Sequence, residues 1–401
     1  MTYFRPLQLW RCTLANDRNE IVITGMSINT PLGDTLDGFI EAMYAGKSAL
    51  SNWSSIDTSN IYSKVGADLG GYDLEQKLTA LEGKIPNSVW KRLRKLHVKL
   101  PWSTRITTTM AVDAFADAGM FAHNYDPSRV GVIVSGHNIN VNYDYENRTQ
   151  FDRQPDHIDS LYGLQTLDTD HAASVSEVLG LFGPVYTIGA ACASGNVALR
   201  NAIDELRHHD LDAVLIVGPV FDWSPIMLHG MALLGAISFN GFVDSPTQAS
   251  RPYDARREGF VPAHGGGAIV LEKLAGAKAR GVRHYAQVLA AEATSSGSHL
   301  PTPSAAWQAE AMRRTLASSS VAPSQIDYVS AHATSTPQGD LSELQAIEEV
   351  FGEHAKKLHI NAPKSLLGHT CWSAPIVELV AAVLQMPVSY THLRAHETGR
   401  N

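Results

Sequence analysis

Cysteine is scarce in this sequence, which has only three, Cys12, Cys192 and Cys371, among 401 residues. Three cysteines cannot build the framework of several disulfides that stabilises small secreted domains. A protein that keeps its thiols free fits a reducing compartment, so we expect a cytoplasmic location. Because 44% of the residues are hydrophobic, a chain of this length can instead bury one large core or two ordinary ones.

An excess of positive charge is also lacking, since the formal net charge is -8 and the isoelectric point is about 6.1. Nucleic acids and anionic membranes are bound through basic surfaces, so we expect neither as a partner. One basic segment, KRLRKLHVK from Lys91 to Lys99, departs from this trend. Two interpretations stay open for it: a solvated helix face, which is the commoner case, and a docking surface for an acidic protein partner.

Long apolar runs are absent as well. The most apolar stretch, 213–239, contains Asp222, Pro225 and His229 together with several glycines, so it does not have the character of a membrane span. The segment before Ile21 mixes Arg, Asp and Glu with apolar residues and has no apolar signal-peptide core. We therefore expect a soluble protein.

Metal-binding motifs are not evident. His208 and His209 are adjacent, but adjacent imidazoles on a helix point about 100° apart. No cysteine or carboxylate lies near them at the spacing of zinc ligands. We expect no metal site.

Short β-branched runs alternate with segments of helical periodicity. Residues 21–26 (IVITGM) form an apolar run, and apolar residues at helical spacing follow at 36–44. Residues 129–134 and 213–217 are nearly continuous apolar runs, as in strands that are buried on both faces. The pattern predicts an α/β protein with buried sheets.

A second series of elements has a similar order. It comprises strands near residues 265–272, 284–291 and 326–329 and a helix at 340–350. The repeated order predicts a structural duplication. We place the boundary in the polar, turn-rich stretch 244–257, so that residues 20–255 form one half and residues 256–387 the other.

Cys192 lies between a predicted strand and a predicted helix in the segment YTIGAACASG. A thiol at the first turn of a helix faces unpaired backbone N–H groups and the positive end of the helix, which lowers its pKa and favours the thiolate. A lone cysteine is about as often a small buried apolar residue. The neighbours Ala191, Ala193 and Gly195 favour a nucleophile, because small side chains leave room for a substrate.

Two further segments carry a histidine next to a predicted strand or helix. In YVSAHATSTPQGD, His332 follows a strand and precedes hydroxyl side chains and a turn. In NAPKSLLGHT, Lys364 is close enough to His369 to influence it electrostatically. An imidazole at a sheet edge is typical of ligand sites in α/β folds, although a structural histidine is about as common there.

Taken together, the three segments resemble the motifs of the β-ketoacyl synthase family. The cysteine motif, the His-x-Thr-x-Thr-Pro-x-Gly-Asp motif that begins at His332 and the Lys-Ser-x-x-Gly-His motif that begins at Lys364 occur in the family's order. Shorter matches lie at 23–26, 251–254 and 258–261, and the resemblance covers residues 20–387. It implies a thiolase-like, duplicated fold in five layers, αβαβα, and a homodimer.

The resemblance also implies a catalytic role for each motif. Cys192 would accept an acyl chain from the phosphopantetheine thiol of an acyl carrier protein and hold it as a thioester. His332 and His369 would hydrogen-bond the malonyl thioester and stabilise the enolate that forms when carbon dioxide leaves. This decarboxylative condensation, in fatty acid or polyketide biosynthesis, would need no cofactor of the enzyme's own.

Three more residues receive supporting roles from the same resemblance. Lys364 would keep the surroundings of His369 in order. Thr334 and Thr336 would hydrogen-bond the pantetheine arm of the carrier.

The sequence departs from the family at 371–375 (CWSAP), where small residues usually follow the second histidine. Trp372 would crowd the pocket, so we expect an unusual or small acyl substrate. Two alternative functions stay open. A malonyl-acyl carrier protein decarboxylase of a polyketide β-branching cassette would usually have serine in place of Cys192, and a non-catalytic partner subunit would lack the nucleophile.

A second departure lies at Ala263 and His264, where the family usually has glycine and an acidic residue. The third concerns the end of the chain. The family closes with a few dozen further residues, including a Gly-rich loop whose Phe N–H completes the oxyanion hole beside Cys192. Residues 388–401 are basic and non-periodic, so we expect a non-native tail, a truncated C-terminal end and an incomplete oxyanion hole.

Overall fold

The computed structural model describes residues 20–386 except residue 240. Cys12 and the predicted non-native tail at 388–401 therefore lie outside the described residues. Among the helices of the described part, none combines the length and the apolar character that crossing a membrane requires.

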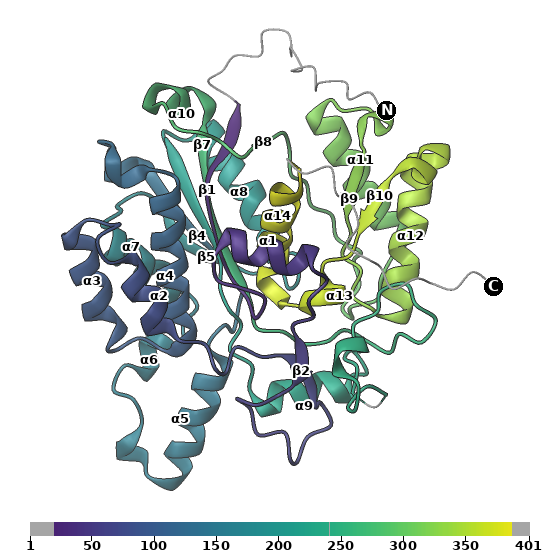
Figure 1. Ribbon diagram of the computed structural model, residues 1–401, viewed down its shortest axis with the longest axis horizontal. Helices are drawn as coiled ribbons and strands as arrows, with labels where there is room; N and C mark the ends of the chain where they lie inside the picture. The colour runs from purple at the N-terminus through teal and green to yellow at the C-terminus, as the bar shows by residue number, and fades with distance from the viewer. Residues whose placement is uncertain (1–19, 240, 387–401) are drawn as a thin grey trace.

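A six-stranded mixed sheet forms the centre of the larger part of the molecule (Figure 1). From edge to edge it contains β5 (Val185–Ile188), β4 (Val130–Ser135), β6 (Ala213–Gly218), β7 (Gly266–Lys273), β1 (Ile21–Asn29) and β8 (Ala286–Val288). β4 is parallel to β5 and β6, whereas β7 is antiparallel to both β6 and β1, and β8 is antiparallel to β1.

The inner strands are apolar because both faces of the sheet are covered. Every residue of β1, β4 and β6 is buried. Side chains alternate between the faces, so Val132 and Val134 join one core cluster and Ile133 joins the other. This burial explains the uninterrupted apolar runs that predicted these strands.

Helices cover the two faces of the sheet. On one face lie α4 (Trp102–Asp117) and α7 (Thr169–Leu179), with α2 (Leu74–Leu81) and α3 (Asn87–His97) packed outside them. On the other face lie α8 (Ser194–His208) and α14 (Ala374–Gln385), and α1 (Leu36–Tyr44) contacts both α14 and β1. The helix predicted at 36–44 is therefore confirmed.

A smaller second sheet lies beyond α14. It consists of the parallel pair β9 (Tyr328–Ser330) and β10 (His359–Asn361), and β9 contacts α14. Figure 1 shows α12 (Pro337–Phe351) on the side of this sheet away from α14, and α11 (Ala305–Ser319) contacts α12. Helices, sheet, helices, sheet and helices thus follow one another across the molecule, which confirms the predicted α/β architecture in five layers.

The strands predicted near 265–272 and 284–291 do form, as β7 and β8, but not in the second sheet. β7 lies between β6 and β1, and its residues from Gly266 to Glu272 are all buried. The sequence pattern shows that a strand is buried but not which strands pair with it. The first sheet thus contains segments from both sides of the boundary predicted at 255/256, and that division of the chain stays a prediction.

The remaining elements surround these layers. They are the antiparallel pair β2 (Leu50–Asn52) and β3 (Val65–Ala67) and the helices α5 (Val141–Arg153), α6 (Tyr162–Gln165), α9 (Pro225–Leu233), α10 (Leu274–Arg280) and α13 (Lys364–Leu367). A short 3-10 turn, η7 (Cys371–Ser373), leads from α13 into α14 and contacts α8. It brings the C-terminal motif against the Cys192 segment.

Candidate active site

Cys192 lies on a sharp turn between the end of β5 and the start of α8. Ala191 has φ 48°, a left-handed conformation that costs a non-glycine residue about 1 kcal/mol. The buried Ser194 hydroxyl holds the turn, because it accepts from the Ala190 N–H at 2.8 Å and donates to the Ala191 carbonyl at 2.6 Å. The turn places Cys192 just ahead of the α8 N-terminus, as the sequence predicts.

The protonation of Cys192 differs from the expectation. Burial raises its pKa to about 11, while the Lys364 ammonium acts in the opposite direction. The predicted lowering of the pKa is therefore wrong, because desolvation of the thiolate outweighs the helix terminus and the nearby cation. At neutral pH the side chain is a thiol, and its proton has to leave when the sulfur attacks.

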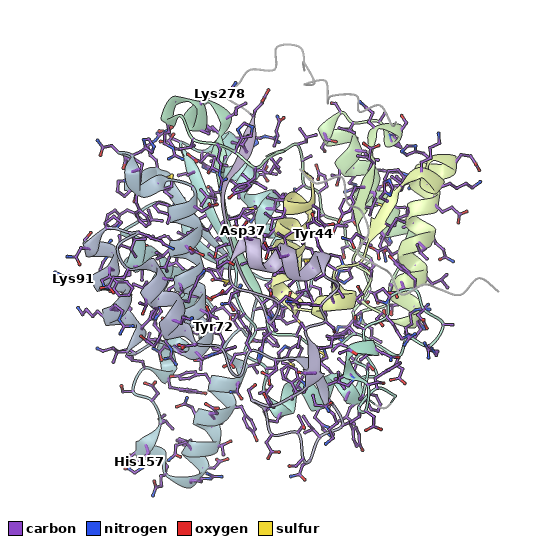
Figure 2. All side chains as sticks on the ribbon, in the orientation of Figure 1. Asp37, Tyr44, Tyr72, Lys91, His157 and Lys278 are labelled. Carbon is purple, nitrogen blue, oxygen red and sulfur yellow. The ribbon has the colours of Figure 1, made fainter. Side chains whose placement is uncertain are left out.

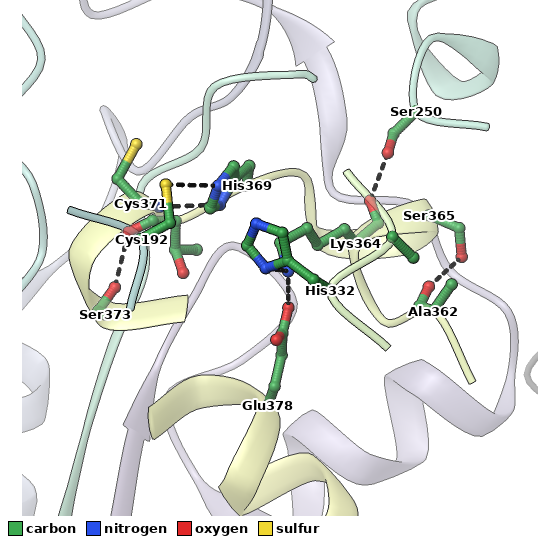
Figure 3. A network of polar contacts seen from close by, with 12 residues as sticks. Cys192, Ser250, His332, Ala362, Lys364, Ser365, His369, Cys371, Ser373 and Glu378 are labelled. Atoms are coloured by element: carbon green, nitrogen blue, oxygen red, sulfur yellow. Dashed lines mark hydrogen bonds and ion pairs between the residues drawn. The ribbon is translucent and has the colours of Figure 1, made fainter. Parts of the chain in front are cut away.

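His369 faces Cys192 with one ring nitrogen. Its Nε2 lies 3.1 Å from the Cys192 sulfur, and its Nδ1 accepts the Cys371 N–H at 3.2 Å (Figure 3). An Nδ1 that accepts leaves the proton on Nε2, so His369 is a donor toward the site. The ring is also held edge-on to Phe260, with centroids 5.1 Å apart.

His332 lies beside His369, with ring centroids 5.3 Å apart and planes at 85°. Its Nδ1 is 3.4 Å from Nζ of Lys364, which forms an ion pair with Glu378 on α14. An ammonium can only donate, so Nδ1 of His332 accepts and Nε2 carries the proton. Lys364 therefore contacts His332, whose ring packs against that of His369.

Both imidazoles are held in the neutral form. Desolvation within the cluster of Cys192 and the two imidazoles lowers the pKa of His332 and of His369 well below 6.5, and the Lys364 charge lowers each further. His369 is buried, whereas His332 is exposed at the surface of the described chain. The electrostatic influence of Lys364 on His369 is thus confirmed, although it acts without contact. The result is a pair of neutral Nε2–H donors at one site.

The ligand atoms of Cys192, His332 and His369 all lie within 4.8 Å of one another. A thiol and two imidazoles are also zinc-ligand types, so the spacing alone fits a metal. A zinc-bound histidine normally donates its other ring N–H to an acceptor. Here Nδ1 of each imidazole accepts instead, from Cys371 or Lys364, which fits hydrogen-bond donors better than metal ligands.

Thr334 and Thr336 lie in the loop between β9 and α12. Their hydroxyl oxygens are 3.0 Å apart, and both lie over Gly339, where a Cβ would be 2.4 Å from the Thr336 oxygen. A side chain at Gly339 would therefore displace them. The structure places the two threonines together on the same loop as His332, and their role toward a carrier arm stays a prediction.

Two carboxylates from α12 hold this loop, and neither was singled out from the sequence for that purpose. Glu343 accepts the N–H groups of His332 and Ala333 at 2.6 and 2.8 Å. Asp340 accepts the Ser335 N–H at 3.0 Å and pairs with Arg257 at 3.4 Å. These acceptors sustain a loop in which Ala333 and Ser335 have positive φ.

Glu378 was also missed, although the sequence contains a signal for it. It is the one charged residue in the apolar helix α14 (APIVELVAAVLQ) and is largely buried, with a side chain 12% exposed. A charge in an otherwise apolar helix implies a buried partner. That partner is Lys364.

Ala263 and His264, where the sequence departs from the family, lie in a segment that contacts the backbone of His369. Ala263 is part of the segment whose backbone pairs with His369, and Trp223 donates its indole N–H to the Ala263 carbonyl at 3.1 Å. His264 is buried beside Trp53 and accepts the Leu69 N–H at 3.1 Å. The histidine thus links the Leu69 segment to residues 261–263, whose backbone pairs with His369.

Comparisons with known proteins agree with this geometry. The family models for the β-ketoacyl synthase N-terminal and C-terminal domains match residues 18–277 and 285–396. A 3-oxoacyl-[acyl-carrier-protein] synthase 2 of Coxiella burnetii is 30% identical over 375 residues, covering 92% of this chain and 86% of the relative. The polyketide biosynthesis malonyl-ACP decarboxylase PksF of Bacillus subtilis is 27% identical over 373 residues, covering 93% and 85%.

Solved structures show the same fold. A β-ketoacyl synthase from Burkholderia phymatum has a TM-score of 0.79 at 28% identity, covering 92% of this chain and 86% of that one. A type II polyketide ketosynthase solved with its acyl carrier protein, AntDE:AntF, has a TM-score of 0.77 at 26% identity, covering 91% and 86%. The fold is thiolase-like, and the chain belongs to the β-ketoacyl synthase family.

Proposed function

We propose that this protein is a β-ketoacyl-acyl carrier protein synthase, an acyltransferase that condenses an acyl thioester with malonyl-acyl carrier protein in fatty acid or polyketide biosynthesis. One observation carries the proposal: the Cys192 thiol lies 3.1 Å from Nε2 of His369, with His332 alongside. The site therefore joins a nucleophile to two neutral hydrogen-bond donors.

In the first half of the reaction, the Cys192 sulfur attacks the carbonyl carbon of an acyl thioester. The new bond joins Cys192 Sγ to the acyl carbon, and the bond to the carrier sulfur breaks. Because the Cys192 pKa is about 11, the sulfur gives up its proton as the attack proceeds, and that proton ends on the departing carrier thiol.

In the second half, malonyl-acyl carrier protein enters on the imidazole side of the sulfur. The Nε2–H groups of His332 and His369 donate to the thioester oxygen, where negative charge collects as carbon dioxide leaves. The resulting carbanion attacks the acyl carbon on Cys192, and the cysteine sulfur departs as a thiolate that takes up a proton from solvent. The β-ketoacyl product remains on the carrier, and this sequence of steps uses no metal or redox cofactor of the enzyme's own.

Lys364 has a positioning role in this scheme. Its ammonium donates a hydrogen bond to Nδ1 of His332 and forms an ion pair with Glu378, which orients it. Without it, His332 could carry its proton on Nδ1 and lose the donor that faces the substrate. Thr334 and Thr336, on the loop that follows His332, would bind the pantetheine arm.

The acyl carrier protein is the proposed partner, as it is for the ketosynthase solved in complex with one. A basic surface suits an acidic protein partner. Lys91, Lys95 and Lys99 are exposed on and just after α3, and Figure 2 shows Lys91 pointing away from the molecule. We assign this Lys91–Lys99 segment to carrier docking, with the solvated helix face as the alternative.

We also propose a homodimer. β5 lies at the edge of the six-stranded sheet, and in the described part of the chain β4 is its only neighbouring strand. Its four residues are only half-buried, and Phe182 just before it is 78% exposed. A second copy could cover this edge. Sedimentation of the intact protein would test this.

We also propose a cytoplasmic location, which the free thiols Cys192 and Cys371 fit.

The test of function is an assay with acetyl- and malonyl-acyl carrier protein. We expect intact mass spectrometry to show one acyl group on Cys192 and the carrier to become an acetoacetyl carrier. Cys192→Ala should remove the adduct, whereas the matched variant Cys371→Ala, which alters the neighbouring thiol, should keep it. No adduct on Cys192 with any acyl carrier would overturn the proposal.

Decarboxylation without condensation is the second candidate, because PksF covers as much of this chain as the synthases do. It predicts acetyl carrier from malonyl carrier with no extended product. That activity should survive Cys192→Ala, since the two imidazoles stabilise the enolate. The same assay therefore separates the two functions by their products.

A further inference from the structure

Aromatic side chains pack around Trp372, in the segment that follows His369. Trp372 is only 7% exposed, and its indole stacks on the His137 imidazole, with centroids 4.4 Å apart and planes inclined by 25°. Phe221 packs against the same indole edge-on, with centroids 5.3 Å apart. Trp372 is therefore held between two rings that come from other parts of the chain.

Two glycines allow this close packing. A Cβ at Gly136, where φ is 143°, would lie 3.2 Å from Cβ and Cδ1 of Trp372. A Cβ at Gly189 would lie 3.0 Å from Cβ and Cδ2 of His137. A side chain at position 136 or 189 would therefore crowd these rings.

The segment that carries Trp372 is also pressed against the first turn of α8. A Cβ at Gly195 would lie 2.9 Å from Cβ of Pro375 and 3.0 Å from Cγ1 of Ile376. Cys371, just before Trp372, has φ 53° and is buried. The segment from Cys371 to Ile376 is therefore packed tightly against the start of α8.

An acyl chain on Cys192 would meet side chains on two sides of the sulfur. On one side of the sulfur stand the two imidazoles, where malonyl thioester would enter. On another side Cys192 packs against the apolar cluster that contains Cys371, Trp372 and Phe221. A hydrocarbon chain that entered this cluster would have to displace side chains, because protein interiors are close-packed.

We propose that Trp372, held in place by His137, is a specificity-determining residue that restricts Cys192 to acetyl or similarly short acyl groups. The inference rests on the proposed function, because it concerns the acyl group that the nucleophile accepts. Within the described residues the Trp372 indole N–H has no hydrogen-bond acceptor. Ring volume and stacking, rather than a hydrogen bond, therefore position the side chain.

A chemical test needs neither a carrier nor turnover. Cys192 is alkylated with iodoacetamide and with N-octyl iodoacetamide, and the adduct is located by peptide mass spectrometry. In the natural protein we expect the octyl reagent to react about tenfold more slowly or worse relative to iodoacetamide. Trp372→Ala should bring the two rates together, whereas Trp372→Phe, which keeps a stacking ring and removes the N–H, should keep most of the difference.

The His137→Ala variant provides a second test that does not depend on the folding of Trp372→Ala. It leaves the indole in the chain but removes the ring on which it stacks, so octyl labelling should rise in the same direction by a smaller factor. Equal rates for the two reagents in the natural protein would overturn the proposal. A difference that persists unchanged in folded Trp372→Ala and His137→Ala would overturn it as well.

Carrier substrates give the second readout. We expect acetyl transfer to Cys192 to exceed octanoyl transfer by about tenfold or more, and Trp372→Ala to reduce that ratio. Octanoyl transfer as fast as acetyl transfer in the natural protein would overturn the restriction while leaving the proposed function standing. Size-selective alkylation together with no transfer from any carrier would support the restriction and overturn the function instead.

Discussion

The sulfur of Cys192 lies 3.1 Å from Nε2 of His369, although 177 positions separate the two residues in the sequence. The backbone of His369 is fastened on both sides to the segment after Phe260, through its N–H to the Val261 carbonyl at 2.7 Å and its carbonyl to the Ala263 N–H at 3.0 Å. These backbone contacts, rather than the side chains of the motif, determine how close the imidazole comes to the thiol.

The reactivity of Cys192 should keep rising with pH. Because burial raises its pKa to about 11, the thiolate fraction should increase about tenfold for each pH unit between about pH 7 and pH 10. The rate of carbamidomethylation by iodoacetamide at Cys192 measures this. Lys364→Met should slow the reaction at each pH, since the ammonium lowers the Cys192 pKa. A plateau near pH 8.5, the range of an ordinary thiol, would contradict the burial argument.

The ion pair between Lys364 and Glu378 should stabilise the fold only as a pair. Glu378→Gln leaves a buried ammonium without its counterion, so we expect the free energy of unfolding to fall by about 3 kcal/mol in urea titrations. Lys364→Met combined with Glu378→Leu should lose less than the single change. The matched control is Glu353→Gln, which breaks an exposed pair with Lys356 and should have no measurable effect. A loss in Glu353→Gln as large as in Glu378→Gln would refute this account.

His332 should matter for decarboxylation more than for acyl transfer. Removing one preorganised donor from a developing oxyanion costs about 10²- to 10³-fold, so His332→Ala should slow release of carbon dioxide from malonyl carrier by that factor. His332→Asn keeps a donor on a shorter side chain and should lose less. Acylation of Cys192 by acetyl carrier, measured by mass, should change far less in both variants.

The pH dependence of the same reaction follows from the two imidazoles. Their pKa values lie well below 6.5, so both stay neutral through neutral pH and the decarboxylation rate should be flat between about pH 6 and pH 8. The unfolded chain, with ordinary histidines, binds more protons below about pH 6.5, so the contribution of this pair to stability should decline as the solution is acidified. A rate that titrates with a midpoint near 6.5 would show that an imidazole is not held neutral.

Glu343 should be required for the position of His332. Glu343→Ala leaves the N–H groups of His332 and Ala333 without their acceptor, at a cost of about 2 kcal/mol in unfolding free energy. We expect decarboxylation to fall together with stability. Glu343→Gln, whose amide has a single oxygen, should lie between the natural protein and the alanine variant. Unchanged decarboxylation in folded Glu343→Ala would show that the loop with His332 keeps its conformation without this acceptor.

Much of the fold could be predicted from local sequence patterns. The helix from Leu36 to Tyr44 follows from apolar spacing, and the β4 and β6 runs follow from their continuous burial. β7 shows the limit, because its run predicts a buried strand but not that it pairs with β6 and β1. Strand partners depend on contacts between distant segments, and a single run contains no information on them.

The candidate site likewise has features that the sequence predicts and others that only the tertiary structure decides. The sequence by itself singled out Cys192, His332, His369 and Lys364, because their motifs are local and together resemble those of one family, and their catalytic roles stay predictions. Only the tertiary structure decided that Lys364 contacts His332 and that burial, not the helix terminus, dominates the Cys192 thiol. Both outcomes depend on which atoms surround a group after folding, since desolvation and the distance between charges are properties of packing and not of position in the chain.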